Sequence, residues 1–153
     1  MAEYLLVANR LGFGEQALRP NEVIKTLLPN RLWLLPETAP LVRKFAAGDR
    51  FLIYAGGESA FYAVAEGSGP PTGVDMSIVP QHFPGLGGFF QYMLRFREVT
   101  MFTQPVSAAH VLDRLSFVKD RRYWGLYFRH SVRRISRRDF DLIVRHALKR
   151  RRP

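Results

Sequence analysis

The sequence of 153 residues contains no cysteine. This absence excludes disulfides, thiolate zinc sites, iron–sulfur clusters and a cysteine nucleophile, and it is typical of a reducing compartment, so we expect a cytoplasmic location. The sequence has no run of about 18 uncharged apolar residues, and we therefore expect no membrane-spanning helix and no membrane partner. We also expect no secretion signal, because Glu3 stands where such a signal is basic and the apolar run of residues 4–8 is short.

Nothing in the sequence divides the chain. It has no internal repeat, no low-complexity tract and no long linker. Hydrophobic residues make up 47% of the chain, which at this length is enough to bury a continuous core without disulfides or metal. We predict a single domain over residues 1–148, followed by a basic tail over residues 149–153.

Acidic residues are scarce near the C-terminus. Residues 1–118 contain 10 basic and 10 acidic side chains, whereas residues 119–153 contain 13 basic and 3 acidic ones, so the whole net charge of +10 lies there. This asymmetry predicts a polyanionic partner. Arginine dominates the segment, and its planar guanidinium group suits phosphates and base stacking, which favours nucleic acid over a membrane surface. The alternative is a basic helix and tail that are merely solvated.

Short apolar segments predict several strands. Gly56 and Gly57 separate two of them and indicate a hairpin. In the longest one, apolar and polar residues alternate, so that Tyr92, Leu94 and Phe96 face the core. The strands that we expect are residues 4–9, 50–55, 60–66 and 89–102.

Helical spacing and capping residues predict four short helices. In the last of them, Ser136 and Asp139 have the spacing of a capping box. The apolar stripe of this helix consists of Phe140, Ile143, Val144 and Ala147, and arginines occupy its other face. Strands flanked by short helices indicate an α+β domain built on a curled sheet or small barrel. The helices that we expect are residues 21–28, 38–47, 107–112 and 136–150, with a Pro/Gly-rich loop over residues 80–88.

Residues 115–128 form the densest local pattern, with basic and aromatic side chains interleaved. Basic groups can hold phosphates while aromatic faces stack on an exposed base. Equally, Phe117, Trp124 and Phe128 can fill the core while the arginines stay solvated.

The segment that begins here resembles the C-terminal signature of the EVE domain family, which is part of the PUA-like superfamily. The residues that carry the resemblance are Phe117, Val118, Lys119, Trp124, Gly125, Phe128, Arg129, Ile135, Asp139, Phe140 and Ile143. The N-terminal part is similar more loosely, at Asn9 and Arg10 and over residues 44–54, where a Gly–Asp turn leads into an apolar strand. The first strand reads Tyr4 where the family often has tryptophan, and Ala55 stands where a small hydroxyl residue often follows.

The resemblance implies a PUA-like pseudobarrel, a curled mixed β-sheet flanked by short helices, that accepts a base of DNA or RNA in an aromatic pocket. The base is often a modified one. Stacking faces, a few polar groups and phosphate-binding cations serve that purpose. The resemblance and the positions place Asn9, Arg10, Trp33, Tyr54, Trp124 and Phe128 around the pocket. Backbone phosphates would be held by Lys119, Arg121, Arg122 and Arg129.

Catalytic patterns are absent from the sequence. The four histidines (His82, His110, His130 and His146) show no metal-ligand spacing, and no pair of carboxylates suggests acid–base chemistry. We therefore expect a non-enzymatic reader of nucleic acid that needs no cofactor and no metal. Two alternatives stay open: an RNA-processing or base-modifying enzyme on the same scaffold, and a basic accessory protein that binds an acidic partner.

Overall fold

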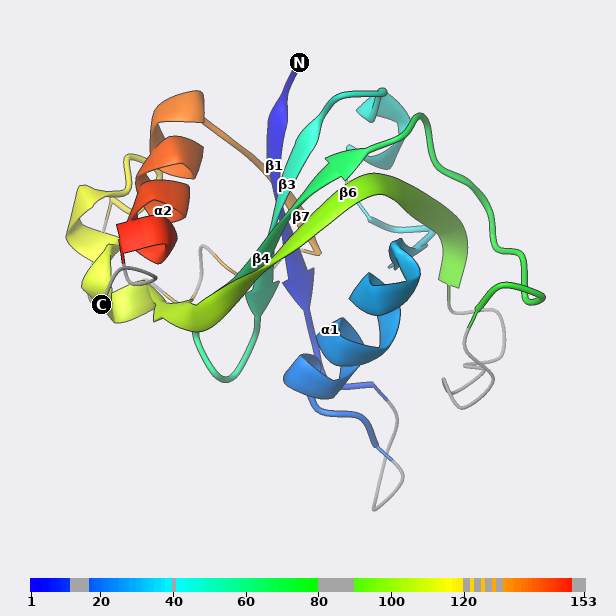
Figure 1. Cartoon of the computed structure of the whole chain (residues 1–153), viewed down its shortest axis with the longest axis horizontal. Coiled ribbons are helices and arrows are strands. Elements are labelled where there is room, and N and C mark those ends of the chain that lie inside the picture. The colour runs from blue at the N-terminus through cyan, green and yellow to red at the C-terminus, as the bar shows by residue number, and fades with distance from the viewer. Residues whose placement is uncertain are drawn as a thin grey trace.

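The computed structural model describes residues 1–11, 17–39, 41–79, 90–119, 122, 125, 128 and 131–149. Figure 1 shows a curved sheet with α1 on one side and α2 on the other. The strands are β1 (Glu3–Ala8), β2 (Leu32–Pro36), β3 (Arg50–Ala55), β4 (Ala60–Gly67), β5 (Thr72–Gly73), β6 (Phe90–Ser107) and β7 (Val132–Ile135). The helices are α1 (Pro20–Leu27) and α2 (Arg137–Lys149), with short 3₁₀ turns η2 (Leu28–Asn30), η3 (Val42–Lys44), η4 (Ala108–His110) and η5 (Leu112–Arg114).

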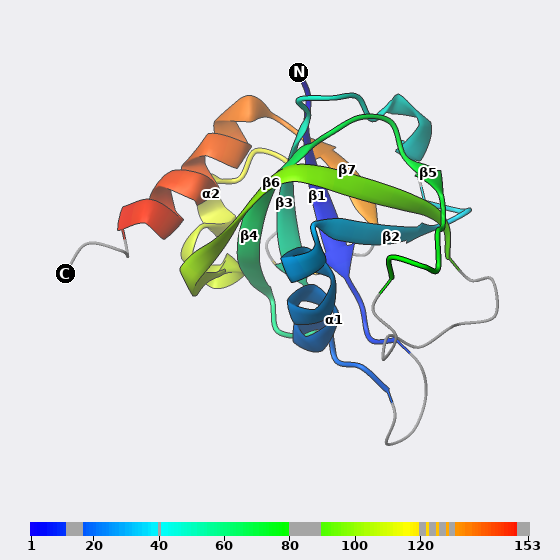
Figure 2. The same ribbon diagram turned by 45° about the vertical axis from the view of Figure 1, so that its right-hand side comes forward.

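The sheet is mixed and strongly curled. Its strand order is β2-β6-β4-β3-β1-β7, and β5 pairs with β6. β1 runs parallel to β3, whereas β1 and β7, β3 and β4, β4 and β6, and β2 and β6 are antiparallel. The long β6 takes part in both halves of the curl, because its first residues pair with β2 and its last residues pair with β4 (Figure 2). The fold is the predicted α+β pseudobarrel.

Two hydrophobic clusters cover the two faces of the central strands. Successive side chains of a strand point to opposite faces. Tyr4 and Leu6 accordingly belong to the cluster beneath α1 and β2, while Leu5 and Val7 belong to the cluster beneath α2. All six residues of β1 are buried, which explains why this strand reads as a continuous apolar run in the sequence.

The last helix begins and packs as the sequence predicts. The backbone N–H of Asp139 donates to the hydroxyl of Ser136 at 3.1 Å, which satisfies one free donor of the first turn. The apolar stripe faces the sheet, with Phe140, Ile143 and Ala147 at most 3% exposed. Among the helices of the described residues, none has the length and apolar character needed to cross a membrane.

A buried carboxylate joins β1, β3 and α2. Glu3 Oε1 accepts from Arg50 Nη2 at 2.9 Å and from Arg137 Nε at 3.3 Å. The Arg50 guanidinium also lies 4.4 Å from the centre of the Phe140 ring. Burial by itself raises the pKa of Glu3, but the hydrogen bonds and charges of the two arginines outweigh it, and the net shift of the pKa is downward. This charge cluster therefore links β1 and β3 to the first turn of α2 and stabilises the fold.

Three sequence predictions need correction. No helix covers residues 38–47 in the described chain: only η3 forms there, because Leu41 adopts a left-handed φ of 65°, which a helix does not accept. The predicted helix over residues 107–112 is instead two 3₁₀ turns, η4 and η5. The long strand continues beyond Phe102 to Ser107. The predicted loop of residues 80–88 lies outside the described residues.

Candidate functional site

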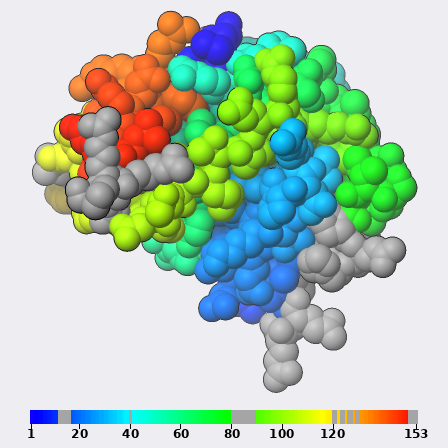
Figure 3. All heavy atoms as spheres, in the orientation of Figure 1, coloured from blue at the N-terminus to red at the C-terminus, as the bar shows by residue number. Residues whose placement is uncertain are grey.

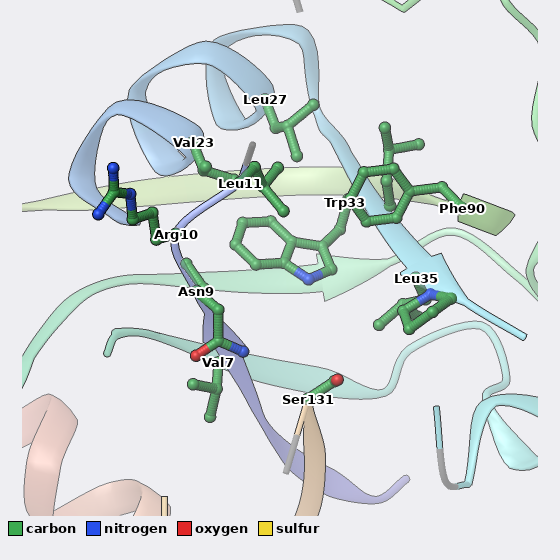
Figure 4. A pocket seen from close by; sticks show the side chains of 13 residues that line it. Val7, Asn9, Arg10, Leu11, Val23, Leu27, Trp33, Leu35, Phe90 and Ser131 are labelled. Carbon is green, nitrogen blue, oxygen red and sulfur yellow. The ribbon is translucent and has the colours of Figure 1, made fainter. Parts of the chain in front are cut away.

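A cavity of about 110 Å³ opens between the end of β1, α1, β2 and the start of β6. Figure 4 shows the Trp33 indole at its centre, with α1 side chains on one side of the ring and Asn9 and Ser131 on the other. The cavity reaches solvent beside Asn9 and Arg10, which are both exposed. The described residues that line it are Val7, Ala8, Asn9, Arg10, Leu11, Val23, Leu27, Trp33, Leu34, Leu35, Pro36, Phe90 and Ser131.

The hairpin turn fixes the corner of the cavity where β1 ends. The N–H of Gly56 donates to the carbonyl of Ala8 at 2.8 Å. A Cβ atom at Gly56 would lie 3.0 Å from the Asn9 side-chain oxygen and 3.1 Å from that carbonyl, so no larger residue fits without displacement. The turn therefore packs closely against Asn9 and sets where its side chain lies.

β2 places Trp33 where it is both buried and reachable. The residue is only 3% exposed and pairs with Leu94 of β6, so both strands hold its backbone. Most of the described cavity wall is aliphatic or aromatic, and among its described residues the polar side chains are those of Asn9, Arg10 and Ser131. A flat aromatic ring, apolar walls and a few polar groups suit a planar heterocyclic ligand.

The structure brings together three of the six predicted pocket residues. Asn9, Arg10 and Trp33 line the same cavity. Tyr54 and Phe128 do not line it: their rings stack on each other in the α2 cluster, with centroids 4.4 Å apart and an interplanar angle of 17°. The reason is strand alternation, since Tyr54 points to the face opposite Ile53, which packs in the α1 cluster. Trp124 lies outside the described residues.

Tyr54 and Phe128 therefore belong to the core. They are 2% and 5% exposed, and the Phe61 and Phe117 rings pack edge-on against Phe128. Burial raises the pKa of Tyr54, although a hydrogen bond with Ser59 opposes the shift, so its phenol is neutral at physiological pH. Sequence composition could not separate this pair from a base-binding pair, because an aromatic ring serves either purpose.

The structure describes two of the four predicted phosphate-binding residues. Lys119 and Arg122 are exposed. Arg121 and Arg129 lie outside the described residues. The structure also shows a cationic hollow of about 260 Å³, lined by Arg114, Leu142, Arg145, His146 and Lys149, which the sequence prediction did not single out.

The cationic hollow differs from the other arginine clusters. Within the described residues, Arg114, Arg145 and Lys149 have no carboxylate oxygen within 4 Å, whereas the arginines at 19, 50, 97, 137 and 138 all do. Backbone carbonyls orient two of the guanidinium groups: Arg114 donates to His110 and Arg145 donates to Asp141, each at 3.3 Å. These cations are free to meet an external anion. The sequence feature that pointed to such a site is the excess of positive charge near the C-terminus.

The described histidines and acidic side chains can be compared with the geometry of a metal site. In this part of the chain, no group of three or more histidine and acidic side chains could hold a metal ion. The His110 and His146 rings lie 6.0 Å apart beside the cationic hollow. His82 and His130 lie outside the described residues.

No protein-family model and no curated protein sequence matches the chain. Solved structures do match it in fold. Human THYN1 in complex with DNA containing 5-methylcytosine is 11% identical with a TM-score of 0.58, and the match covers 96% of this chain and 98% of that one. The MmI1 YTH domain is 9% identical with a TM-score of 0.61, covering 98% and 99%.

The N-terminal domain of McrB from Staphylothermus marinus is a third similar structure, 13% identical with a TM-score of 0.56, and the match covers 94% of this chain and 93% of that domain. At such identities the likeness concerns the fold. Its near-complete coverage of each chain means that the whole pseudobarrel is shared, and not one motif of it. The chain therefore has the PUA-like fold that its resemblance to the EVE domain family predicts.

Proposed function

We propose that this protein is a non-enzymatic nucleic-acid-binding module whose cavity at Trp33 accepts one base of the polymer, including a modified base. The observation that carries the proposal is the placement of Trp33, a buried indole inside a cavity that opens to solvent at two polar residues, Asn9 and Arg10. A base that leaves its stack needs an aromatic or apolar pocket and a few polar contacts at its edge.

Arg10 suits the phosphate next to the inserted base. It is exposed at the mouth of the cavity, and Figure 4 shows its guanidinium group turned away from Trp33 and toward the outside. A permanent cation at this place can bind the backbone while the base enters behind it. Asn9 and Trp33 then contact the base, and Arg10 contacts the polymer.

A second set of phosphate contacts lies near α2. Arg114, Arg145 and Lys149 supply cations without carboxylate partners in the described chain. Figure 3 shows α2, in red and orange, at the upper left of this face and α1, in blue, at its lower centre. We assign the backbone contacts to these residues, and to Lys119, Arg121, Arg122 and Arg129 as the sequence predicts. Trp124 stays a proposed stacking residue.

The similar structures support this proposal. Human THYN1, which has the same fold, is described in complex with DNA that contains 5-methylcytosine. Experiment can distinguish this function from that of a protein that merely attracts polyanions, because the affinity of such a protein for nucleic acid would not depend on the cavity.

The test uses short oligonucleotides that carry one base, all other positions being abasic. The wild-type protein should bind such an oligonucleotide at least about 10-fold more tightly than the fully abasic one, because only the former fills the cavity. In the variant Trp33→Leu this advantage should disappear, while affinity for the abasic backbone stays unchanged. Equal affinities of the wild-type protein for both oligonucleotides would refute the base cavity and leave an electrostatic accessory protein.

A further inference from the structure

The cationic hollow beside α2 is built from two elements of the fold. Arg114 comes from η5, while Leu142, Arg145, His146 and Lys149 come from α2. The last three follow Leu142 at the spacings that place side chains on one side of a helix. Leu142 also packs partly against the hydrophobic cluster beneath α2, which ties the hollow to the core.

Hydrogen bonds to backbone carbonyls hold both guanidinium groups of the hollow in place. Arg114 Nη2 donates to the carbonyl of His110, and Arg145 Nε donates to the carbonyl of Asp141, each at 3.3 Å. The carbonyl of Arg114 in turn accepts from Arg138 Nη1 at 3.3 Å, which links η5 to the first turn of α2. A guanidinium group has several N–H donors, and one bond to a carbonyl leaves the others for a ligand. The two groups are therefore oriented before a ligand arrives, which lowers the entropy cost of binding.

The positive charge of the hollow is not balanced by the residues that line it. Among the described residues of its wall, Arg114, Arg145 and Lys149 are basic and none is acidic. The carboxylate of Asp141 contacts Arg50 at 3.5 Å instead. The C-terminal end of a helix such as α2 contributes about −0.5 elementary charge. This offsets only part of the charge of the three basic residues, and an excess of roughly two positive charges remains.

Imidazole rings add further donors at the same place. His146 lines the hollow, and its ring lies 6.0 Å from the ring of His110. An imidazole N–H can donate a hydrogen bond whether the ring is neutral or charged. Guanidinium, ammonium and imidazole donors gathered around one hollow suit an anion with several oxygens, and phosphate is the anion that guanidinium groups match in geometry.

We propose that the cationic hollow binds a phosphate monoester, the group at the end of a nucleic-acid strand, more tightly than the diesters within the strand. A monoester carries a charge of about −1.5 to −2 at neutral pH and has three terminal oxygens, whereas a diester carries about −1 and has two. The monoester therefore matches the excess charge of the hollow, and its additional oxygen can accept from the second guanidinium group. This inference rests on the proposed function, because it takes the phosphate to belong to a nucleic acid.

The hollow is separate from the cavity at Trp33. Figure 1 shows α1 and α2 on opposite sides of the curled sheet. The cavity is lined by side chains of α1, whereas the hollow is lined by side chains of α2. A phosphate bound in the hollow therefore does not occupy the base cavity, and each site can be tested without the other.

The experiment compares abasic oligonucleotides of one length that end in a 5′-phosphate, in a 3′-phosphate or in hydroxyl groups only. Calorimetry measures their binding to the full chain, and the missing bases keep the Trp33 cavity out of the measurement. Inorganic phosphate is added as a competitor, which distinguishes a free phosphate from a strand end. The variants are Arg114→Gln and Arg145→Gln. Lys25→Gln is the control, because it removes the same charge from an exposed position of α1 outside the hollow. Thermal unfolding checks that each variant is folded.

One of the phosphorylated strands should bind at least about 10-fold more tightly than the strand with hydroxyl ends, since it gains charge-assisted hydrogen bonds. Arg114→Gln and Arg145→Gln should each reduce this preference to less than about 3-fold, while Lys25→Gln and Trp33→Leu should keep it. Equal binding of all three strands by the wild-type protein, or an unchanged preference in both arginine variants, would overturn the inference. Inorganic phosphate that binds as tightly as the phosphorylated strand would overturn the assignment to a strand end.

The result also separates this inference from the proposed function. A preference for the phosphorylated end, together with no advantage of a one-base oligonucleotide over an abasic one, would refute the base cavity and support the monoester site. The opposite result would support the base cavity and refute the monoester site.

Discussion

The carboxylate of Asp139, in the first turn of α2, accepts a 2.6 Å hydrogen bond from the hydroxyl of Ser116, 23 residues earlier in the chain. It also accepts from the Ser116 backbone N–H at 3.1 Å and is itself 0% exposed. This contact holds the start of the basic aromatic segment against the helix that follows it. A segment proposed to bind nucleic acid is thus anchored by a carboxylate that belongs to the fold.

Replacement of Asp139 by alanine should destabilise the protein by about 2–3 kcal/mol, because it removes a buried carboxylate that accepts hydrogen bonds from the hydroxyl and the backbone N–H of Ser116. Urea denaturation measures the free energy of unfolding. Asp141→Asn is the control: Asp141 is half-buried and its contact with Arg50 is 3.5 Å long, so its loss should cost less than about 0.5 kcal/mol. Equal effects of the two substitutions would contradict the anchoring role of Asp139.

Glu3 should make stability depend on acid pH. Burial raises its pKa, the two arginines lower it by more, and the pKa in the folded state lies below the ordinary value of 4.5. The unfolded chain therefore takes up a proton first as the pH falls, and the stabilisation, which is complete above about pH 5, is lost as the pH drops through the folded-state pKa. In Glu3→Gln this loss should be missing. Denaturation of both proteins between pH 2.5 and 7 should show curves that converge in acid, and parallel curves would contradict the assignment.

Gly56 should affect both stability and the cavity. In Gly56→Ala the new Cβ meets the Asn9 oxygen and the Ala8 carbonyl, and the backbone carbonyl cannot swing aside. We expect a loss of about 1–3 kcal/mol and weaker nucleoside binding, because Asn9 is displaced. Gly69→Ala is the matched control, as a Cβ there has no neighbour within 4 Å. Unchanged stability and binding in Gly56→Ala would show that the turn does not position Asn9.

The cationic hollow should control how binding depends on salt. Arg114→Gln, Arg145→Gln and Lys149→Gln combined should lower the slope of log affinity against log salt by about 2, since each phosphate contact on a single strand contributes about 0.7. Nucleoside binding, which involves no phosphate, should not change. Arg97→Gln is the control, because Arg97 is exposed but pairs with Glu66 at 2.8 Å. An unaltered slope in the triple variant would show that the cationic hollow does not contact the phosphates of the nucleic acid.

Sequence patterns predicted the elements that depend on local signals. Strands β1, β3 and β4 and both α-helices lie within a few residues of the predicted segments, because apolar runs, glycine turns and capping residues mark them. β2 and β7 escaped prediction. Trp33 sits in a Leu-rich stretch, which composition alone does not distinguish from other buried structure, and β7 reads as part of the basic segment.

The cavity was predictable only in part, for a reason that lies in the strand geometry. Asn9, Arg10 and Trp33 were identified from position and resemblance, and they do meet. Ser131 and Phe90 contribute to the same wall, yet nothing in their sequence surroundings marks them, because only the pairing of β1 with β7 and of β2 with β6 brings them there. Tyr54 was placed in the pocket although it faces the other core cluster.

The most direct test of the base cavity is the intrinsic fluorescence of Trp33, followed in the wild-type protein and in Trp33→Phe, during titration with nucleosides and short oligonucleotides at two salt concentrations. Because Trp124 also fluoresces, the Trp33 contribution is the difference between the two proteins. We predict that this contribution is quenched saturably by one type of base, and that the quenching by nucleosides is nearly independent of salt. Quenching by oligonucleotides only, indifferent to the base and abolished by salt, would contradict the account and leave the basic C-terminal segment as the sole binding feature.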